Sequence, residues 1–421
     1  MDVEPHPLDA RGSGSPDPAP RIPGSDPRGG ADDGPLTVPR PRSADEYEYA
    51  HRFESFPNPQ YPGVAGDAYG GDGGIGGGEP EEEGDEHHAW PSARRQIGTA
   101  VAILGWAIAL FLVAHRFLPG NAGLVSLLES GLPWLAVPTA LLLIAALGAR
   151  SLRGILATLA AASIWLVGYG PELMPRGDPL PANLRVFSED INAPGAATAE
   201  LAAAAQLAPD QHADIVLLQG VYPQLAASSA LSNLNTSYPN HLTQYEFGIW
   251  SKYRIADSSA VSLGTTTADT KGSGLVAGTR QVVVGALRVT VDTPQGPLVL
   301  YVVHLPQPVL GDQGFAKARD AALARLVKTV RADHAAKLAV VGDINVAQTD
   351  RRFSDLTGLG LTSAQAAAGR GFGFTWPAEF PSVRLDDLLV RGADPVRSVV
   401  LSALSGGKTH LPIEVDLHLT S

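Results

Sequence analysis

The stretch LAVVGDINVAQ, residues 338–348, decides how the second half of this chain folds. Apolar residues typical of a buried strand lead directly to Asp343 and Asn345, and a turn follows. Because side chains alternate along a strand, the spacing predicts that Asp343 and Asn345 lie on the same side of the pleat, at the rim of a sheet. Taken alone, the stretch is more compatible with an ordinary strand end than with a catalytic role, since Gly, Asp and Asn are common turn residues.

Length, charge and cysteine content limit the possible functions. The chain has 421 residues, which is enough for two to three domains. Its formal net charge of −12 argues against a broad basic surface for nucleic acid, so none is expected. Because the sequence has no cysteine, any metal must be bound by oxygen or imidazole groups.

The N-terminal part of the chain differs in composition from the rest. Residues 1–93 are rich in Pro, Gly, Ser and Asp, and they include the acidic block Glu79–Glu86. No sustained apolar periodicity is present, so this segment cannot bury enough surface to offset its chain entropy. We expect a disordered tail.

Three uncharged apolar runs follow, at residues 97–114, 131–148 and 154–170. Each is close to the length needed to cross a hydrocarbon core, and the runs have no polar face. We therefore expect three transmembrane helices, the third being the shortest. Buried core helices are the alternative, which the flanking arginines disfavour.

The distribution of arginine predicts the orientation in the membrane. Arg94 and Arg95 precede the first run, and Arg150 and Arg153 lie in the tight loop between the second and third. The positive-inside rule then places the N-terminal tail in the cytoplasm. With three spans, the linker at residues 171–183 and everything after it lie outside the cell membrane.

The remaining residues, 184–421, contain the strand-like and helix-like patterns of an α/β domain. Two helices are expected, at 198–207 and 315–333. Strands are expected at 184–188, 214–219, 247–251, 281–291, 298–304, 338–343, 384–390 and 413–417. Many strands with few helices favour a domain built on two sheets over a Rossmann unit.

Several of these strands begin or end in polar residues. Residues at strand ends can lie close together at the rim of a sheet and form a functional site even when they are distant in sequence. The stretches are LRVFSEDIN (184–192), ADIVLLQGV (213–221), YVVHLPQP (301–308), RLDDLLV (384–390) and KTHLPIEVDL (408–417). With GDIN, in this order, they resemble the endonuclease/exonuclease/phosphatase family. That resemblance implies a four-layer αββα sandwich of the DNase I-like type. FTWP at 374–377 is similar to a membrane-anchored bacterial branch of the family.

The resemblance also implies a chemistry, namely cleavage of phosphate esters with a divalent metal, Mg²⁺ or Mn²⁺. In that chemistry Asp343 positions and activates water, and Asn345 helps to hold the phosphate. His410, supported by Asp386, stabilises the charge that develops on the phosphate. His304 matches the family's mid-chain residue near the phosphate.

Three positions depart from the family pattern. Gly220 stands where the family has its main metal-binding Glu, Asp190 stands where it has Asn, and Thr409 stands where it has Asp. Since a hard cation needs carboxylate oxygens, we expect Asp190 to hold the metal, with Asn192 on the same side of the strand. Lys408 is expected to contact phosphate.

These observations predict a metal-dependent hydrolase of phosphate mono- or diesters at the outer face of the membrane. Its substrate would be a lipid headgroup or a nucleotide-like ester. The loss of the carboxylate at Gly220 leaves one alternative open. In that alternative the chain is a catalytically inactive family member, a surface domain that binds a ligand or a partner protein.

Overall fold

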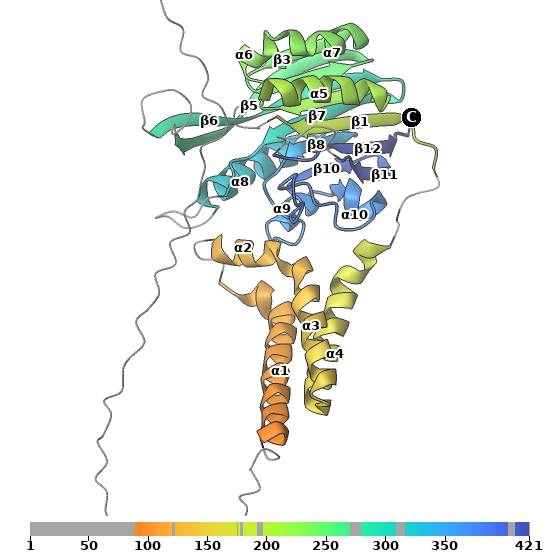
Figure 1. The fold of residues 1–421 in the computed structure, drawn as a ribbon. Helices are drawn as coiled ribbons and strands as arrows, with labels where there is room; N and C mark the ends of the chain where they lie inside the picture. The colour runs from red at the N-terminus through yellow and green to blue at the C-terminus, as the bar shows by residue number, and fades with distance from the viewer. Residues whose placement is uncertain are drawn as a thin grey trace, which may run out of the picture. The chain divides into compact units, whose positions relative to one another are not determined.

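The computed structural model describes residues 89–119, 123–174, 176, 180–191, 197–269, 279–308, 316–402 and 409–420 (Figure 1). The expected disordered tail therefore lies almost wholly outside the described residues. The same holds for two predicted site residues, Asn192 and Lys408.

Among the described residues, four α-helices precede β1 (Leu184–Asp190). They are α1 (Ala89–Ala114), α2 (Leu124–Ser130), α3 (Ala136–Gly148) and α4 (Leu152–Tyr169). The segments Ala93–Phe117 and Leu152–Leu173 are each long and apolar enough to cross a membrane. Two of the three expected spans are thus found as helices of the required length.

The second expected span, residues 131–148, is not one straight helix. Its N-terminal part is a 3-10 turn that contains Pro133, and only Ala136–Gly148 is α-helical. Leu124–Ser130 and Leu132–Gly148 form a pair bent by 57°, which gives a third span only if the pair crosses as a unit. Proline disfavours a continuous α-helix here because it lacks an N–H and clashes with the preceding turn.

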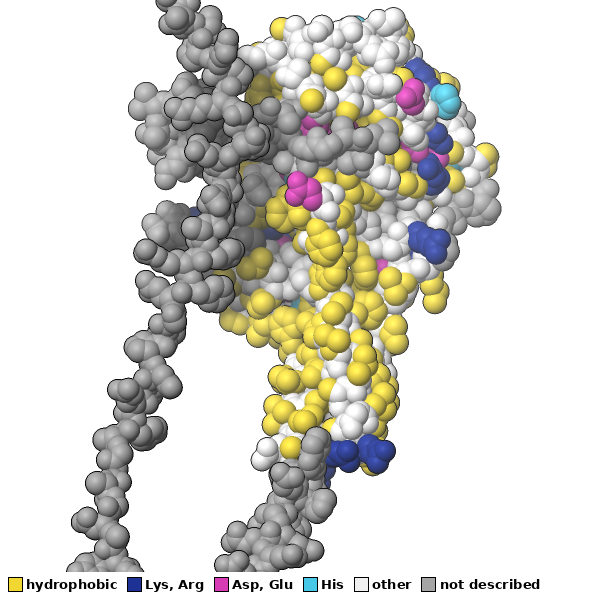
Figure 2. Space-filling view, in the orientation of Figure 1, with side chains coloured by type: hydrophobic (Ala, Val, Ile, Leu, Met, Phe, Trp, Pro, Cys, Tyr) yellow, Lys and Arg dark blue, Asp and Glu magenta, His cyan; other side chains and the backbone are white. Residues whose placement is uncertain are grey.

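Small residues set the packing of α1 against α4. A Cβ built on Gly105 of α1 would lie 3.0 Å from the Cβ of Ala157, and one built on Gly98 would lie 2.6 Å from that of Ser151. Close backbone approach of this kind is typical of helices that associate in a membrane. The contact between Gly98 and Ser151 also places Arg94 and Arg95 at the same end of the bundle as the loop before α4. Figure 2 shows basic side chains at one end of the helical segment, whose visible surface is otherwise largely hydrophobic.

Within the described residues, the strands form two six-stranded sheets. The first has the order β11-β12-β1-β2-β4-β3, with β1 (Leu184–Asp190), β2 (Ile215–Gln219), β3 (Asn240–Gln244), β4 (Phe247–Ser251), β11 (Asp394–Val400) and β12 (Ile413–His418). The second has the order β5-β6-β7-β8-β10-β9, with β5 (Arg254–Asp269), β6 (Thr279–Thr293), β7 (Gly296–His304), β8 (Leu338–Asp343), β9 (Thr362–Ser363) and β10 (Asp386–Arg391).

The two sheets pack face to face and are covered by helices on their outer faces (Figure 1). Alternate residues of β7 show why: Leu300 and Val302 face the core between the sheets, whereas Tyr301 and Val303 face the outer helix α8 (Lys317–Ala332). On the other side, α5 (Ala197–Asp210) and α7 (Ser232–Ser237) cover the first sheet. Both faces of the central strands are apolar, as sheets buried on both sides require. The predicted four-layer αββα sandwich is confirmed.

Some elements were not expected from the sequence. They are the strands β3, β5, β9 and β11 and the short helices α6 (Pro223–Ala226), α7, α9 (Phe353–Thr357) and α10 (Ala364–Ala368). β5 is rich in Ser and Thr, and β11 is half-buried, so neither has the apolar run that marks a central strand. Both are edge strands of their sheets, and an edge strand is less buried, so its sequence need not be continuously apolar.

A buried polar contact joins α2 to the sandwich. The Glu129 carboxylate is fully buried and accepts hydrogen bonds from the Arg351 backbone N–H and guanidinium, each at 2.9 Å. The His115 ring lies 3.0 Å from the same carboxylate. Because a charge buried without a partner is costly, Glu129 and Arg351 hold the end of α2 against the loop that follows β8.

Aromatic side chains form a second contact. The Trp134 ring stacks on Phe374 and Phe380, with centroids 5.8 and 5.9 Å apart, and its N–H donates to the Ser382 carbonyl at 2.7 Å. Phe374 is the first residue of FTWP. The feature that suggested membrane anchoring in the sequence is therefore a contact with the helical segment.

Candidate active site

Strand register brings the predicted residues to one edge of the two sheets. Parallel pairing of β7 with β8 sets His304 beside Asp343, and antiparallel pairing of β8 with β10 sets Asp386 on the other side of Asp343. In the other sheet, Asp190 ends β1 directly beside Gln219 at the end of β2. The strands were predicted from their apolar runs, and their pairing explains why residues distant in sequence converge.

His410 links the two sheets. It lies just before β12, whose first residue Ile413 pairs with Ser188 of β1. Its Nδ1 is 2.8 Å from an Asp386 carboxylate oxygen, and its Nε2 is 3.9 Å from Asp190 Oδ2. Asp386 therefore fixes the ring so that Nε2 faces the other sheet.

A second carboxylate–imidazole pair was not predicted from the sequence. His304 Nε2 lies 3.9 Å from Asp343 Oδ2, and His304 Nδ1 lies 3.6 Å from Glu246 Oε1. Glu246 belongs to the turn between β3 and β4. The two histidines are thus arranged alike, with an outer carboxylate at Nδ1 and an inner carboxylate facing Nε2. The inner carboxylates are those of Asp190 and Asp343.

Burial and crowding of charge perturb these groups strongly. Burial raises the pKa of Asp343 to about 8, with neighbouring carboxylates adding to the rise and the two histidines opposing it. Burial by itself lowers the pKa of His410, but nearby carboxylates, chiefly that of Asp386, outweigh it and raise the value to about 10. The pKa of His304 rises to about 10 in the same way, chiefly through Asp190. The surrounding carboxylates thus favour the protonated form of both imidazoles.

Asn345 is held rigidly just beyond β8. Its backbone has a φ of 53°, a left-handed conformation that Asn tolerates better than most residues. The side-chain N–H group donates to the Leu305 carbonyl at 2.8 Å and to Asp343. The Asn345 Oδ1 atom is buried and has no hydrogen-bond partner among the described residues. One acceptor thus remains available in the site.

Two glycines are required by the backbone at this edge. Gly342 has a φ of +125°, and a Cβ there would lie 2.3 Å from the Val303 carbonyl oxygen. Gly220 has a φ of +73°, and a Cβ there would lie 2.2 Å from the Ile191 carbonyl oxygen. The backbone at Gly220 therefore has no room for any side chain. A carboxylate does lie at this position, because the Asp190 Oδ1 atom would be 3.5 Å from the same Cβ.

Comparison with known families agrees with this geometry. Residues 182–408, more than half of the chain, match the model of the Endonuclease/Exonuclease/phosphatase family. The chain belongs to this family. A comparison with curated proteins finds no match.

The chain is also similar to several solved structures, at low sequence identity. Sphingomyelinase C from Streptomyces griseocarneus is 15% identical, with a TM-score of 0.41 over 56% of this chain and 99% of that one. The mannosyl-6-phosphatase of Bacteroides thetaiotaomicron is 17% identical, with a TM-score of 0.40 over 56% and 99%. The endonuclease/exonuclease/phosphatase from Bacteroides vulgatus is 16% identical, with a TM-score of 0.43 over 56% and 98%.

The buried oxygens of this endonuclease/exonuclease/phosphatase member suit a hard divalent cation. Both carboxylate oxygens of Asp190 are buried and accept no hydrogen bond from any described residue. Ligand atoms of Asp190, His304 and Asp343 all lie within 4.8 Å of one another, and those of Asp343, Asp386 and His410 form a second such group. A buried carboxylate without donors is costly unless a cation neutralises it, so the donor set fits a metal.

The predicted site residues have different outcomes. Asp190, His304, Asp343, Asp386 and His410 come together with Asn345 at one edge, as described above. Asn192 and Lys408 lie outside the described residues, so their predicted roles stay predictions. Glu246 was missed because its position depends on the β3–β4 hairpin, and β3 is a polar, partly exposed strand.

The FTWP loop supports the catalytic pair. The fully buried Thr375 accepts hydrogen bonds through its hydroxyl from the backbone N–H groups of Leu385, at 3.1 Å, and Asp386, at 3.3 Å. Its carbonyl accepts from the Leu411 N–H at 2.8 Å. Thr375 thus holds the backbone at Asp386 and next to His410, while Phe374 contacts the helical segment.

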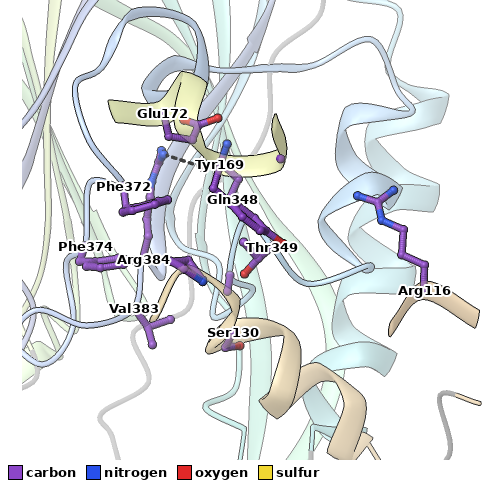
Figure 3. A pocket seen from close by; sticks show the side chains of 13 residues that line it. Arg116, Ser130, Tyr169, Glu172, Gln348, Thr349, Phe372, Phe374, Val383 and Arg384 are labelled. Atoms are coloured by element: carbon purple, nitrogen blue, oxygen red, sulfur yellow. Dashed lines mark hydrogen bonds between the residues drawn. The ribbon is translucent and has the colours of Figure 1, made fainter. Parts of the chain in front are cut away.

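A separate polar pocket of about 170 Å³ lies between the helices and the sandwich (Figure 3). Arg116, Ser130 and Glu172 line it from the helical side, and Gln348 and Arg384 line it from the sandwich. None of the six predicted site residues that the structure describes lines this pocket. It belongs to the contact between the two parts and not to the catalytic edge.

Proposed function

We propose that this chain is a membrane-anchored phosphoesterase that hydrolyses phosphate mono- or diesters with a divalent metal, Mg²⁺ or Mn²⁺. The observation that carries the proposal is the cluster around Asp190, whose buried oxygens have no hydrogen-bond donor among the described residues. Membership of the endonuclease/exonuclease/phosphatase family supports the reaction class.

Asp190 would hold the metal. The Asn345 amide N–H group already donates to Leu305 and Asp343, so its Oδ1 would serve as a further oxygen ligand instead of holding the phosphate as the resemblance implied. When bound, the metal neutralises charge on the phosphate and lowers the pKa of bound water. Asp343, whose raised pKa lies near neutral pH, would orient the attacking water and, in its ionised form, accept its proton. As the water oxygen bonds to phosphorus and the ester P–O bond breaks, negative charge grows on the phosphate oxygens.

The two histidines meet that charge. Asp386 holds His410 at Nδ1, and Glu246 faces Nδ1 of His304, so the Nε2–H groups of both rings point toward the inner carboxylates. Positive donors that are already oriented stabilise a phosphoryl transition state without reorganisation. We further propose that Lys408 contacts the phosphate and that Asn192 assists the metal, as their positions in the sequence suggest.

The reaction would take place outside the cell. Arg94, Arg95, Arg150 and Arg153 lie at one end of the helices, which supports placing that end and the N-terminal tail in the cytoplasm. If the bent helix pair is one span, the catalytic domain lies outside. A lipid headgroup or nucleotide-like ester then suits the acidic chain better than genomic DNA.

The test uses the full chain in nanodiscs. Hydrolysis of bis-p-nitrophenyl phosphate and p-nitrophenyl phosphate is measured with Mg²⁺, with Mn²⁺ and with chelator, and metal binding is measured by calorimetry. We expect metal-dependent turnover that Asp190→Asn reduces. Since even an outer-shell change costs about 10–100-fold in metal affinity, loss of a direct ligand should cost at least as much.

Asp257→Asn is the matched control, because its side chain is 65% exposed and lies outside the cluster. It should bind metal and hydrolyse ester as the parent does. If neither ester is hydrolysed and Asp190→Asn binds metal as the parent does, the proposal is wrong. The alternative of a non-catalytic binding domain then becomes the better account.

A further inference from the structure

A groove of about 470 Å³ opens beside the catalytic edge. Three elements form it: the turn after Gly220, the β3–β4 turn and the paired strands β5 and β6. The lining residues are Tyr222, Pro223, Tyr245, Glu246, Phe247, Ala260, Val261, Ser262, Gly285 and Ala286.

The chemistry of this lining is apolar with one charged end. Glu246 is the single charged residue in the set, and no lysine, arginine or histidine is among these described residues. The rim carries two exposed aromatic rings, Tyr222 at 47% and Tyr245 at 64% exposure. Exposed apolar surface in a concave site is typical of ligand binding. Without a cation, the groove does not suit the backbone of a nucleic acid, which is a polyanion.

The groove is continuous with the catalytic cluster. Glu246 lines the groove and also faces His304, at 3.6 Å. His304 in turn lies 3.9 Å from the inner carboxylate of Asp343. A single imidazole therefore separates the apolar surface from the place where phosphate would bind. The Val221 N–H donates to the Glu246 carbonyl, which ties the two turns that form this end of the groove.

We infer that the groove binds the hydrocarbon part of an amphiphilic phosphate ester whose phosphate lies at the catalytic cluster. This inference rests on the proposed function and narrows its substrate class to esters that carry an alkyl or acyl group. Two helices of the same chain are long and apolar enough to cross a membrane, where such esters are abundant.

The test is a series of p-nitrophenyl alkyl phosphates, from methyl through butyl to octyl, below their micelle concentrations. The full chain in nanodiscs is assayed with Mg²⁺ or Mn²⁺. We expect kcat/KM to rise about 2- to 4-fold for each added methylene, the upper value being that of a fully buried methylene at about 0.8 kcal/mol. The binding of the corresponding alkyl phosphates, measured by calorimetry, should rise in the same way.

Two variants on one strand localise the effect. Ser262 lines the groove, whereas Ser259 of the same strand is exposed and does not line it. Ser262→Trp should remove the gain with chain length, so that octyl and methyl esters behave alike. Ser259→Trp should keep the parent's ratio of octyl to methyl ester.

The outcomes separate this inference from the proposed function. If the methyl ester is hydrolysed but chain length has no effect, the groove inference is wrong and the proposed function stands. If no ester is hydrolysed, the proposed function is wrong and the binding series decides the groove. Binding that does not depend on chain length, or that depends on it equally in Ser262→Trp, overturns the inference.

Discussion

Arg319 of α8 offers the sharpest test of how the helical segment supports the catalytic loop. Its side chain is only 2% exposed. The guanidinium donates to the Asn345 carbonyl at 3.1 Å and to the Ser126 hydroxyl of α2 at 3.0 Å, and it lies 3.1 Å from the Asp350 carboxylate. One side chain thus joins the loop after β8 to α2. We predict that Arg319→Met destabilises the protein and lowers its phosphoesterase activity.

The magnitude follows from the partner that remains. In Arg319→Met the Asp350 carboxylate, which is fully buried, keeps its charge and loses its cation. Removing one partner of a buried pair costs about 3–5 kcal/mol. For a domain of the size of residues 184–421, each kcal/mol lost from the free energy of unfolding lowers the melting temperature by about 2–4 °C. The expected decrease is therefore about 6–20 °C.

A second substitution tests the reason given. Asp350→Asn added to Arg319→Met removes the uncompensated charge while keeping an acceptor for the Arg352 N–H, which now donates at 2.9 Å. Most of the lost stability should return, because an absent buried pair costs far less than a broken one. Intrinsic tryptophan fluorescence of the full chain in detergent reports the melting temperature.

The matched control is Arg331→Met, at an exposed position in the last turn of the same helix. It should change stability by less than about 1 kcal/mol, the size of an exposed helix-dipole effect. The reasoning is refuted if Arg319→Met costs no more than this control. The reasoning is also refuted if the loss of stability in the double variant equals the sum of the losses in Arg319→Met and Asp350→Asn alone.

Two further predictions concern the catalytic edge. Gly220→Glu should lower the free energy of unfolding by more than about 1–2 kcal/mol, which is the cost of a side chain in a left-handed conformation. Calorimetry should show that the variant does not bind Mg²⁺ more tightly than the parent. A stable variant with higher metal affinity would contradict this prediction. Thr375→Val should lose about 1–3 kcal/mol and slow ester hydrolysis, because the Leu385 and Asp386 N–H groups lose their acceptor. Thr375→Ser keeps the hydroxyl, so an equal loss in both variants would show that the hydrogen bonds are not the cause.

Apolar runs allowed the central strands to be predicted closely. The predicted strands 338–343 and 247–251 coincide with β8 and β4, since both are buried along their whole length. A strand buried on both faces needs a continuous apolar sequence, and the polar residue that ends it marks the sheet rim. The strand ends drew attention to Asp190, His304 and Asp343, and the family resemblance then suggested their roles.

Glu246 and Gly220 show what the sequence could not reveal. The approach of Glu246 to His304 depends on the pairing of β3 with β4 and on the packing of one sheet on the other, neither of which leaves a local pattern. At Gly220, the sequence indicates a missing carboxylate, whereas the backbone shows a position that accepts no side chain. A glycine that looks like a simple loss of a carboxylate is therefore required by the local backbone of this chain.

The catalytic loops and the contacts with the helices are made by the same segments. The loop after β8 carries Asn345 and, through Arg319, reaches Ser126 of α2. The FTWP loop holds Asp386 through Thr375 and stacks Phe374 on Trp134. Removing the helices would take Ser126 from Arg319 and Trp134 from Phe374, so the position of the two loops depends in part on the helical segment. The proposed activity is consequently expected to depend on the helical segment, and a domain cut at the linker should lose part of it.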